Sequence, residues 1–148
     1  MNDRHHKAVL FACSENALRS PIAAALARHF SGRDVYFASA GVRAGMLDDF
    51  AVAVMDEIGL DISNHRPTSL EDLDDTGFDL IITLSPEAHH WVLDMTRTMS
   101  LEVQYWPTPD PSAVIGSREQ ILSAYRGLRD GLTTRIKALL DRRPMGSV

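Results

Sequence analysis

The chain has 148 residues, of which 45% are hydrophobic and 24% are charged. This length and composition suit one globular domain with a sizeable core and argue against a second domain. The formal net charge of -5, without a basic tract, argues against binding to nucleic acid or to an anionic membrane surface.

The N-terminal segment lacks the long apolar core of a signal peptide, and no apolar run approaches the length of a transmembrane helix. The single cysteine, Cys13, cannot form an intramolecular disulfide, which fits a reducing compartment. We therefore expect a cytoplasmic protein with one domain over residues 1–148 and with no membrane or nucleic-acid partner.

The first predicted elements are a strand, a short polar loop and a helix. Residues 8–12 form a continuous apolar run, typical of a strand buried on both faces of a parallel sheet. Residues 20–30 carry apolar side chains at helical spacing, with Ser20 as the expected N-cap and Pro21 at the first helical position. Cys13 lies in the loop between the two elements.

Strands and helices alternate along the rest of the chain. The remaining predicted strands cover residues 35–40, 78–84 and 103–106, and the helices cover residues 48–58, 86–95 and 117–139. Gly41 can adopt backbone angles that other residues avoid, and Gly59 closes a helix. This order predicts an α/β fold with a four-stranded parallel sheet flanked by helices on both faces. Ligands of such sheets bind at the carboxyl ends of the strands, where the Cys13 loop lies.

The spacing between Cys13 and Arg19 predicts an oxyanion site. A loop of this length can curl so that successive N–H groups face one tetrahedral anion, and the residues concerned are Ser14, Glu15, Asn16, Ala17, Leu18 and Arg19. Arg19 adds a planar cationic fork that grips two oxygens. Such a positive environment also stabilises a thiolate, the reactive form of cysteine. A lone cysteine after a strand is commonly a buried small hydrophobe, but the neighbouring Arg19 favours a nucleophile.

Residues 11–21, Phe-Ala-Cys-Ser-Glu-Asn-Ala-Leu-Arg-Ser-Pro, resemble the signature loop of the low-molecular-weight protein tyrosine phosphatases and of the related arsenate reductases. Similar segments follow in the family's order at residues 39–41, 59–66, 78–82 and 110–111. The resemblance extends from residue 8 to about residue 140 and implies the α/β fold expected above. It also implies chemistry without a metal or another cofactor.

In that family, the side chains of Asn, Ser and His residues brace the loop. The matching positions in this chain are Asn16, Ser20, Ser39 and His65. The resemblance implies that the Ser20 hydroxyl also donates to the sulfur. From the residues alone, Asn16 equally fits a turn residue and Ser20 an N-cap. Likewise, Ser39 fits a hydroxyl at a strand end, and His65 fits a surface loop.

The family supplies the leaving-group proton from the Asp of an Asp-Pro pair, which maps onto Asp110. An Asp in a Pro-rich turn is common, but Cys13 and Arg19 together favour the general acid. The implied mechanism begins with in-line attack of the Cys13 thiolate on phosphorus while the loop and Arg19 hold the oxygens. Asp110 protonates the leaving group, and water then hydrolyses the phosphocysteine with Asp110 as the base.

The chain departs from both branches of the family. The tyrosine phosphatases follow Asp-Pro with two tyrosines, whereas this chain has Ser112 and Ala113, and residues 41–47 contain no aromatic residue. The pocket rim must therefore differ. The thioredoxin-coupled reductases use two further cysteines, whereas this chain has Ser85 where the first would lie and no cysteine besides Cys13. An internal disulfide relay is thus excluded.

These observations predict a cysteine-dependent phosphomonoester hydrolase that takes a phosphate ester or another tetrahedral oxyanion. A phosphotyrosine protein is one candidate substrate. The alternative is an arsenate reductase that uses an external small thiol such as glutathione. A third hypothesis is a non-catalytic oxyanion-binding module, which would have no need of a leaving-group acid at Asp110.

Overall fold

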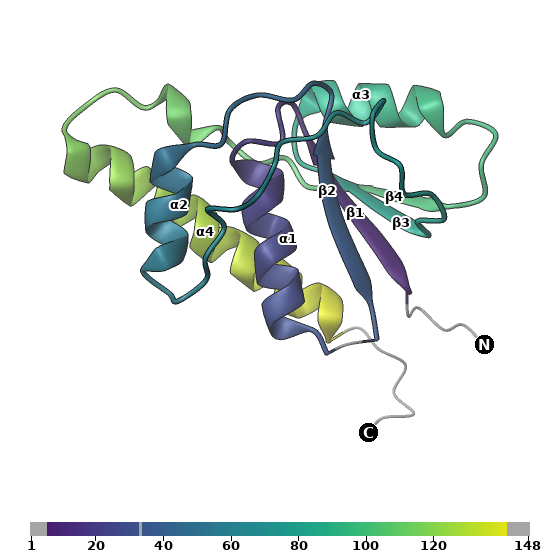
Figure 1. Ribbon diagram of the computed structural model, residues 1–148, viewed down its shortest axis with the longest axis horizontal. Coiled ribbons are helices and arrows are strands. Elements are labelled where there is room, and N and C mark those ends of the chain that lie inside the picture. The colour runs from purple at the N-terminus through teal and green to yellow at the C-terminus, as the bar shows by residue number, and fades with distance from the viewer. Residues whose placement is uncertain (1–5, 33, 142–148) are drawn as a thin grey trace.

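Short apolar segments alternate with amphipathic ones and form a layered α/β structure (Figure 1). The computed structural model describes residues 6–32 and 34–141. Its strands are β1 (Ala8–Cys13), β2 (Tyr36–Gly41), β3 (Leu80–Thr83) and β4 (Glu102–Tyr105). Its helices are α1 (Arg19–Phe30), α2 (Asp49–Asp56), α3 (Pro86–Met95), the 3-10 helix η1 (Pro111–Ala113) and α4 (Arg118–Leu140).

The four strands form one parallel sheet in the order β2-β1-β3-β4. The predicted α/β fold with four parallel strands is confirmed. In the ladder, Cys13 pairs with Gly41, and Ala12 pairs with Thr83. The carboxyl ends of β1, β2 and β3 therefore meet at one edge of the sheet, and β1 carries the cysteine into that edge.

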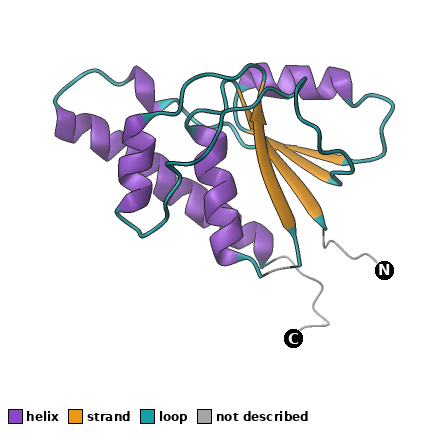
Figure 2. Ribbon diagram, viewed as in Figure 1, coloured by secondary structure: helices purple, strands orange, loops and turns teal. Residues whose placement is uncertain are grey.

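Successive residues of β1 point to opposite faces of the sheet, and both faces are covered by helices (Figure 2). Val9, Phe11 and Cys13 belong to a buried cluster that includes side chains of α1, α2 and α4. Leu10 and Ala12 belong to a second cluster that includes side chains of α3. Because β1 is buried on both faces, its apolar run is continuous rather than alternating, as the sequence indicated.

The expected N-cap of α1 is wrong. The helix begins at Arg19, and Leu18 occupies the cap position without a side-chain hydrogen bond, so Ser20 and Pro21 are the second and third helical residues. The hydroxyl of Ser20 instead lies 2.9 Å from the sulfur of Cys13. At α4 the expected cap is present: Ser117 and Gln120 form a reciprocal capping box.

Gly41 is required for a reason other than its backbone angles, since only Gly59 and Gly77 have positive φ among the described glycines. A Cβ atom on Gly41 would lie 2.6 Å from the backbone nitrogen of Asn16. The absence of a side chain therefore lets the end of β2 approach the Cys13 loop. Within residues 6–32 and 34–141, no helix combines the length and apolarity needed to cross a membrane.

Candidate active site

A pocket of about 330 Å³ opens at the carboxyl edge of the sheet, at the start of α1. It brings together the three residues predicted to be catalytic, Cys13, Arg19 and Asp110. The other residues that line it are Ser14, Glu15, Ala17, Leu18, Arg43, Met46, Asp48 and Ser112. Of the residues predicted to bind the oxyanion, only Asn16 is not among the lining residues, and its side chain is fully buried.

Cys13 lies at the base of the pocket and is 2% exposed. Its sulfur accepts a hydrogen bond from the backbone N–H of Asn16 at 3.3 Å and lies 2.9 Å from the Ser20 hydroxyl. A hydroxyl can donate to a thiolate, so both neighbours favour negative charge on the sulfur. The position suits a nucleophile that is reached only through the pocket.

The loop after Cys13 presents uncommitted backbone donors. Within the described part of the chain, five of its N–H groups donate to no protein acceptor, namely those of Ser14, Glu15, Ala17, Leu18 and Arg19. All five residues line the pocket. Unpaired donors at a helix N-terminus are what an oxyanion requires, because together they supply hydrogen bonds and positive potential.

The side chain of Asn16 holds the loop from behind. Its amide Nδ2 donates to the hydroxyls of Ser20 at 2.8 Å and Ser39 at 2.9 Å. Its Oδ1 accepts from the backbone N–H of Thr68 at 2.9 Å. Asn16 also has a φ of 55°, the only positive φ among the described non-glycine residues. These contacts fix a left-handed turn that would otherwise relax.

His65 completes the contacts of Asn16. Its Nε2 lies 3.0 Å from the backbone oxygen of Asn16 and 3.1 Å from Oδ1. Both partners are acceptors, so Nε2 carries the proton. Burial lowers the pKa of His65, an effect that the hydrogen bond to the Asn16 backbone opposes. The four residues that the family resemblance marks as bracing therefore form one connected network.

Arg19 connects the oxyanion loop to the segment that bears Asp110. Its Nη1 donates to the carbonyl oxygen of Thr108 at 2.9 Å. That segment is also held to the end of β3, because the Thr108 N–H donates to the carbonyl of Leu84 at 3.1 Å. One side of the guanidinium thus positions the segment from residue 106 to residue 110, while Arg19 also lines the pocket.

Asp110 is exposed at the rim and is the N-cap of η1. One of its carboxylate oxygens, Oδ1, accepts two hydrogen bonds from Ser112: from the backbone N–H at 3.0 Å and from the hydroxyl at 2.6 Å. Within the described residues, Oδ2 has no hydrogen-bond partner. Asp110 thus contributes to the pocket lining with one carboxyl oxygen bound by Ser112 and the other free of such contacts.

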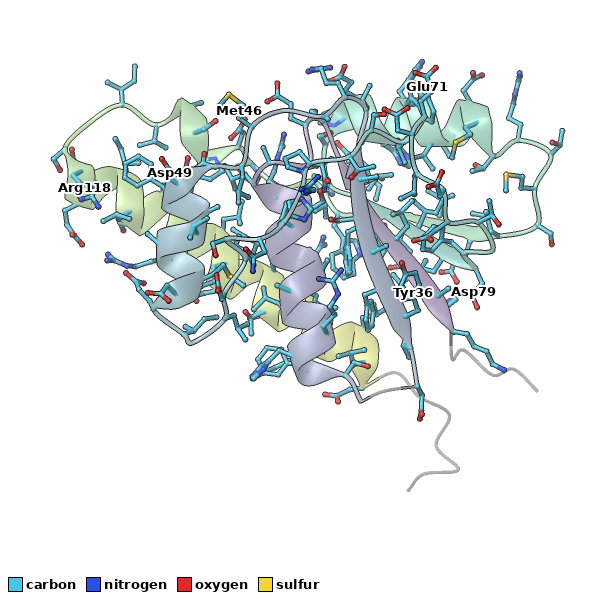
Figure 3. All side chains as sticks on the ribbon, viewed as in Figure 1. Tyr36, Met46, Asp49, Glu71, Asp79 and Arg118 are labelled. Atoms are coloured by element: carbon cyan, nitrogen blue, oxygen red, sulfur yellow. The ribbon has the colours of Figure 1, made fainter. Side chains whose placement is uncertain are left out.

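The opposite wall is the segment between β2 and α2, and it is held against the Cys13 loop by backbone hydrogen bonds. The N–H groups of Val42, Arg43, Gly45 and Asp48 donate to the carbonyls of Cys13, Ser14, Glu15 and Ala17 at 2.9–3.0 Å. Met46, labelled in Figure 3 on this segment, is 88% exposed. Among the described residues, none that lines the pocket is aromatic, in agreement with the lack of aromatic residues at positions 41–47.

Some of these contacts were not foreseen from the sequence. Thr68 binds Asn16 through its backbone N–H. Because nearly every residue type has this group, the sequence does not indicate the contact. Asp48 was only the first residue of the helix predicted over residues 48–58, yet its Oδ1 caps α2 while its Oδ2 accepts from the Tyr125 hydroxyl at 2.7 Å. Arg43 forms ion pairs with Glu87 at 2.7 Å and Glu15 at 3.6 Å. The contacts of Thr68, of Arg43 and of Asp48 with Tyr125 join segments that are distant in sequence.

The described residues contain no group of three or more His, Cys, Asp or Glu side chains placed to hold a metal ion. The site residues instead place a cysteine thiol, unpaired backbone N–H groups, an arginine and a carboxyl group in one pocket. This set can bind a tetrahedral oxyanion, attack its central atom and protonate a leaving group.

A sequence profile of the low molecular weight phosphotyrosine protein phosphatases matches residues 8–142. The chain belongs to this family. An arsenate reductase from Bacillus subtilis (strain 168) is 30% identical over 92% of this chain and 96% of its own length. A glutaredoxin arsenate reductase from a Synechocystis strain is 26% identical over 92% and 98% of the two chains.

The fold agrees with that assignment. The low molecular weight protein tyrosine phosphatase from T. tengcongensis superimposes with a TM-score of 0.77 and 28% sequence identity, over 92% of this chain and 99% of that one. The low molecular weight phosphatase family therefore accounts for the sheet and its helices, and its members are enzymes that act as phosphatases or arsenate reductases.

Proposed function

We propose that this chain is a cysteine-dependent phosphomonoester hydrolase that works through a phosphocysteine intermediate. The observation that carries the proposal is the meeting of Cys13, Arg19 and Asp110 in one pocket. Binding of an anion needs only the loop and the arginine. A carboxyl group that lines the pocket is needed only when a leaving group must be protonated.

In the first step, the Cys13 thiolate attacks phosphorus in line with the bond to the leaving oxygen. The S–P bond forms as the P–O bond breaks, and the Asp110 proton passes to the departing oxygen. The free N–H groups of the loop and the Arg19 guanidinium hold the three equatorial oxygens of the phosphoryl group. The Ser20 hydroxyl donates to the sulfur before the attack.

In the second step, Asp110 is a carboxylate and takes a proton from water. The oxygen of that water attacks phosphorus, the S–P bond breaks, and the electron pair returns to the sulfur. Inorganic phosphate leaves, and Asp110 is again protonated for the next cycle. The Ser20 hydroxyl and the Asn16 N–H stabilise the released thiolate.

The alternative is an arsenate reductase, a class to which the relatives from Bacillus subtilis and Synechocystis belong by name. The Cys13 pocket can hold arsenate, which has the shape and charge of phosphate. With one cysteine in the chain, the reducing equivalents must come from an external thiol. The hydroxyl of Ser85 lies beside the loop, 3.0 Å from the hydroxyl of Ser14. Unlike a thiol, a hydroxyl cannot form a disulfide and so cannot supply reducing equivalents.

A paired assay tests the proposal. Hydrolysis of an aryl phosphate is compared with arsenate reduction in the presence of glutathione or glutaredoxin, for wild type, Cys13→Ser and the exposed-site control Ser123→Ala. We expect hydrolysis in wild type and control, and its loss in Cys13→Ser. Hydrolysis by Cys13→Ser at the wild-type rate would contradict the mechanism. Arsenate reduction without hydrolysis would favour the alternative. If neither reaction is found, the non-catalytic module is favoured.

Asp110→Asn tests the acid separately. With an alkyl phosphate, whose leaving oxygen is strongly basic, we expect kcat/KM to fall by about two to four orders of magnitude. An unchanged kcat/KM would show that another group supplies the proton.

A further inference from the structure

The residue that replaces the first rim tyrosine of the family is in direct contact with the general acid. Ser112 binds Oδ1 of Asp110 twice, through its N–H at 3.0 Å and through its hydroxyl at 2.6 Å. Both residues line the pocket. Two donors on a single oxygen make the two oxygens of this carboxyl group chemically different, although they are equivalent in a free carboxylate.

The difference decides where a proton can reside. A protonated carboxyl group has one hydroxyl oxygen, which donates, and one carbonyl oxygen, which accepts. Oδ1 already accepts hydrogen bonds from the N–H and the hydroxyl of Ser112. A proton on Oδ1 would therefore clash with the hydrogen of a Ser112 donor. The proton therefore resides on Oδ2, which is without a hydrogen-bond partner among the described residues.

We propose that Ser112 is a positioning residue that directs the catalytic proton of Asp110 to Oδ2, the oxygen available to the leaving group. The inference rests on the proposed phosphatase function. When the leaving oxygen takes the proton from Oδ2, the negative charge is shared with Oδ1, where both Ser112 donors remain in place. When water is the nucleophile, Oδ2 recovers a proton by the reverse route.

The two contacts contribute differently. The N–H of Ser112 belongs to the turn that begins η1 and survives any side-chain substitution. The hydroxyl at 2.6 Å is lost in Ser112→Ala, and Ser112→Thr keeps it. Because Ser112 is exposed and Asp110 keeps its turn, we expect Ser112→Ala to fold as wild type.

The test uses a series of phosphate monoesters whose leaving groups range from nitrophenols to alkyl alcohols. The measured quantity is kcat/KM, which covers every step up to departure of the leaving group. We expect Ser112→Ala to lower kcat/KM about tenfold for the alkyl ester, a part of the full value of a general acid. For a good leaving group, which departs without a proton, the loss should be less than about twofold. Ser112→Thr should restore the wild-type dependence.

A double-mutant cycle removes the remaining ambiguity. In an Asp110→Asn background, Ser112→Ala should have no further effect on the alkyl ester, because Ser112 acts only through the acid. A loss of equal size for all leaving groups, or the same loss in the Asp110→Asn background, would overturn the inference while leaving the phosphatase intact. Absence of turnover in both wild type and Ser123→Ala would reject the proposed function and this inference together.

Discussion

Asn16 shows how much of the site depends on single side chains. Its amide is fully buried and uses both donors and its acceptor oxygen, on contacts from Ser20, Ser39, Thr68 and His65. Leaving a buried amide without partners destabilises the fold by more than the net free energy of the hydrogen bonds that it makes. Loss of one partner is therefore expected to weaken the whole network. The candidates Asn16, Ser20, Ser39 and His65 were available from the sequence by family resemblance. Their geometry was not, because a turn residue and a bracing residue look alike in one sequence.

The network is expected to weaken in mild acid. Burial lowers the pKa of His65 from its ordinary value of 6.5. Between that value and the lower value of the folded state, the unfolded chain binds more protons, so the free energy of unfolding decreases as the pH falls through this window. Urea unfolding at pH 7.5 and at pH values below about 6.5 measures the change.

His65→Gln lacks the titrating ring and should remove this part of the pH dependence. The exposed His90→Gln is the matched control and should keep it. An equal pH dependence in wild type and His65→Gln would show that the half-buried ring does not contribute.

At the scale of elements, boundaries were predicted less well than the elements themselves. The helix Pro86–Met95 is found as expected, but the strand expected at residues 78–84 is only Leu80–Thr83. Strand ends are decided by ladder partners: Leu80 and Thr83 pair with Glu102 and Tyr105, at the ends of the short β4. The register is a property of two segments, so neither segment alone indicates it.

Helix α4 supports the pocket wall through one hydrogen bond. The Tyr125 hydroxyl, on a residue that is 2% exposed, donates to Asp48, and burial together with this bond raises the pKa of Tyr125. Tyr125→Phe should therefore lower the free energy of unfolding by about 1 kcal/mol. Urea denaturation measures the loss, and Tyr105→Phe, at an exposed strand end, is the control. Equal stability of Tyr125→Phe and wild type would contradict a net contribution from this bond.

For the molecule as a whole, fold class and the placement of the site followed from the sequence, whereas strand order did not. Alternating strands and helices imply parallel pairing, and parallel strands imply a site at their carboxyl ends. The central place of β1 emerges only from contacts on both sides, with β2 and with β3. Those contacts depend on how whole layers pack, which no local pattern contains.

The same central place buries the side chains of β1 in the core. Phe11 is fully buried, with its ring centroid 6.3 Å from that of Phe37 and 6.1 Å from that of Trp106. Phe11→Ala should cost about 3–5 kcal/mol of unfolding free energy, the range for a buried aromatic that leaves a cavity. Ile115→Ala, at a side chain that is 96% exposed, should cost less than about 0.5 kcal/mol. Chemical denaturation measures the unfolding free energy. A small decrease in Phe11→Ala would mean that the surrounding side chains move to fill the cavity.

The contacts of Asn16 also bear on transplantation. A graft of residues 13–20 onto another strand–helix junction would carry the cysteine, the backbone donors and the arginine. It would lack the hydrogen bonds that Ser39, His65 and Thr68 make with Asn16. The left-handed turn at Asn16 would then be free to unwind, and the donors would disperse. The portable unit is therefore larger than the motif: it is the loop together with the end of β2 and the segment that follows α2.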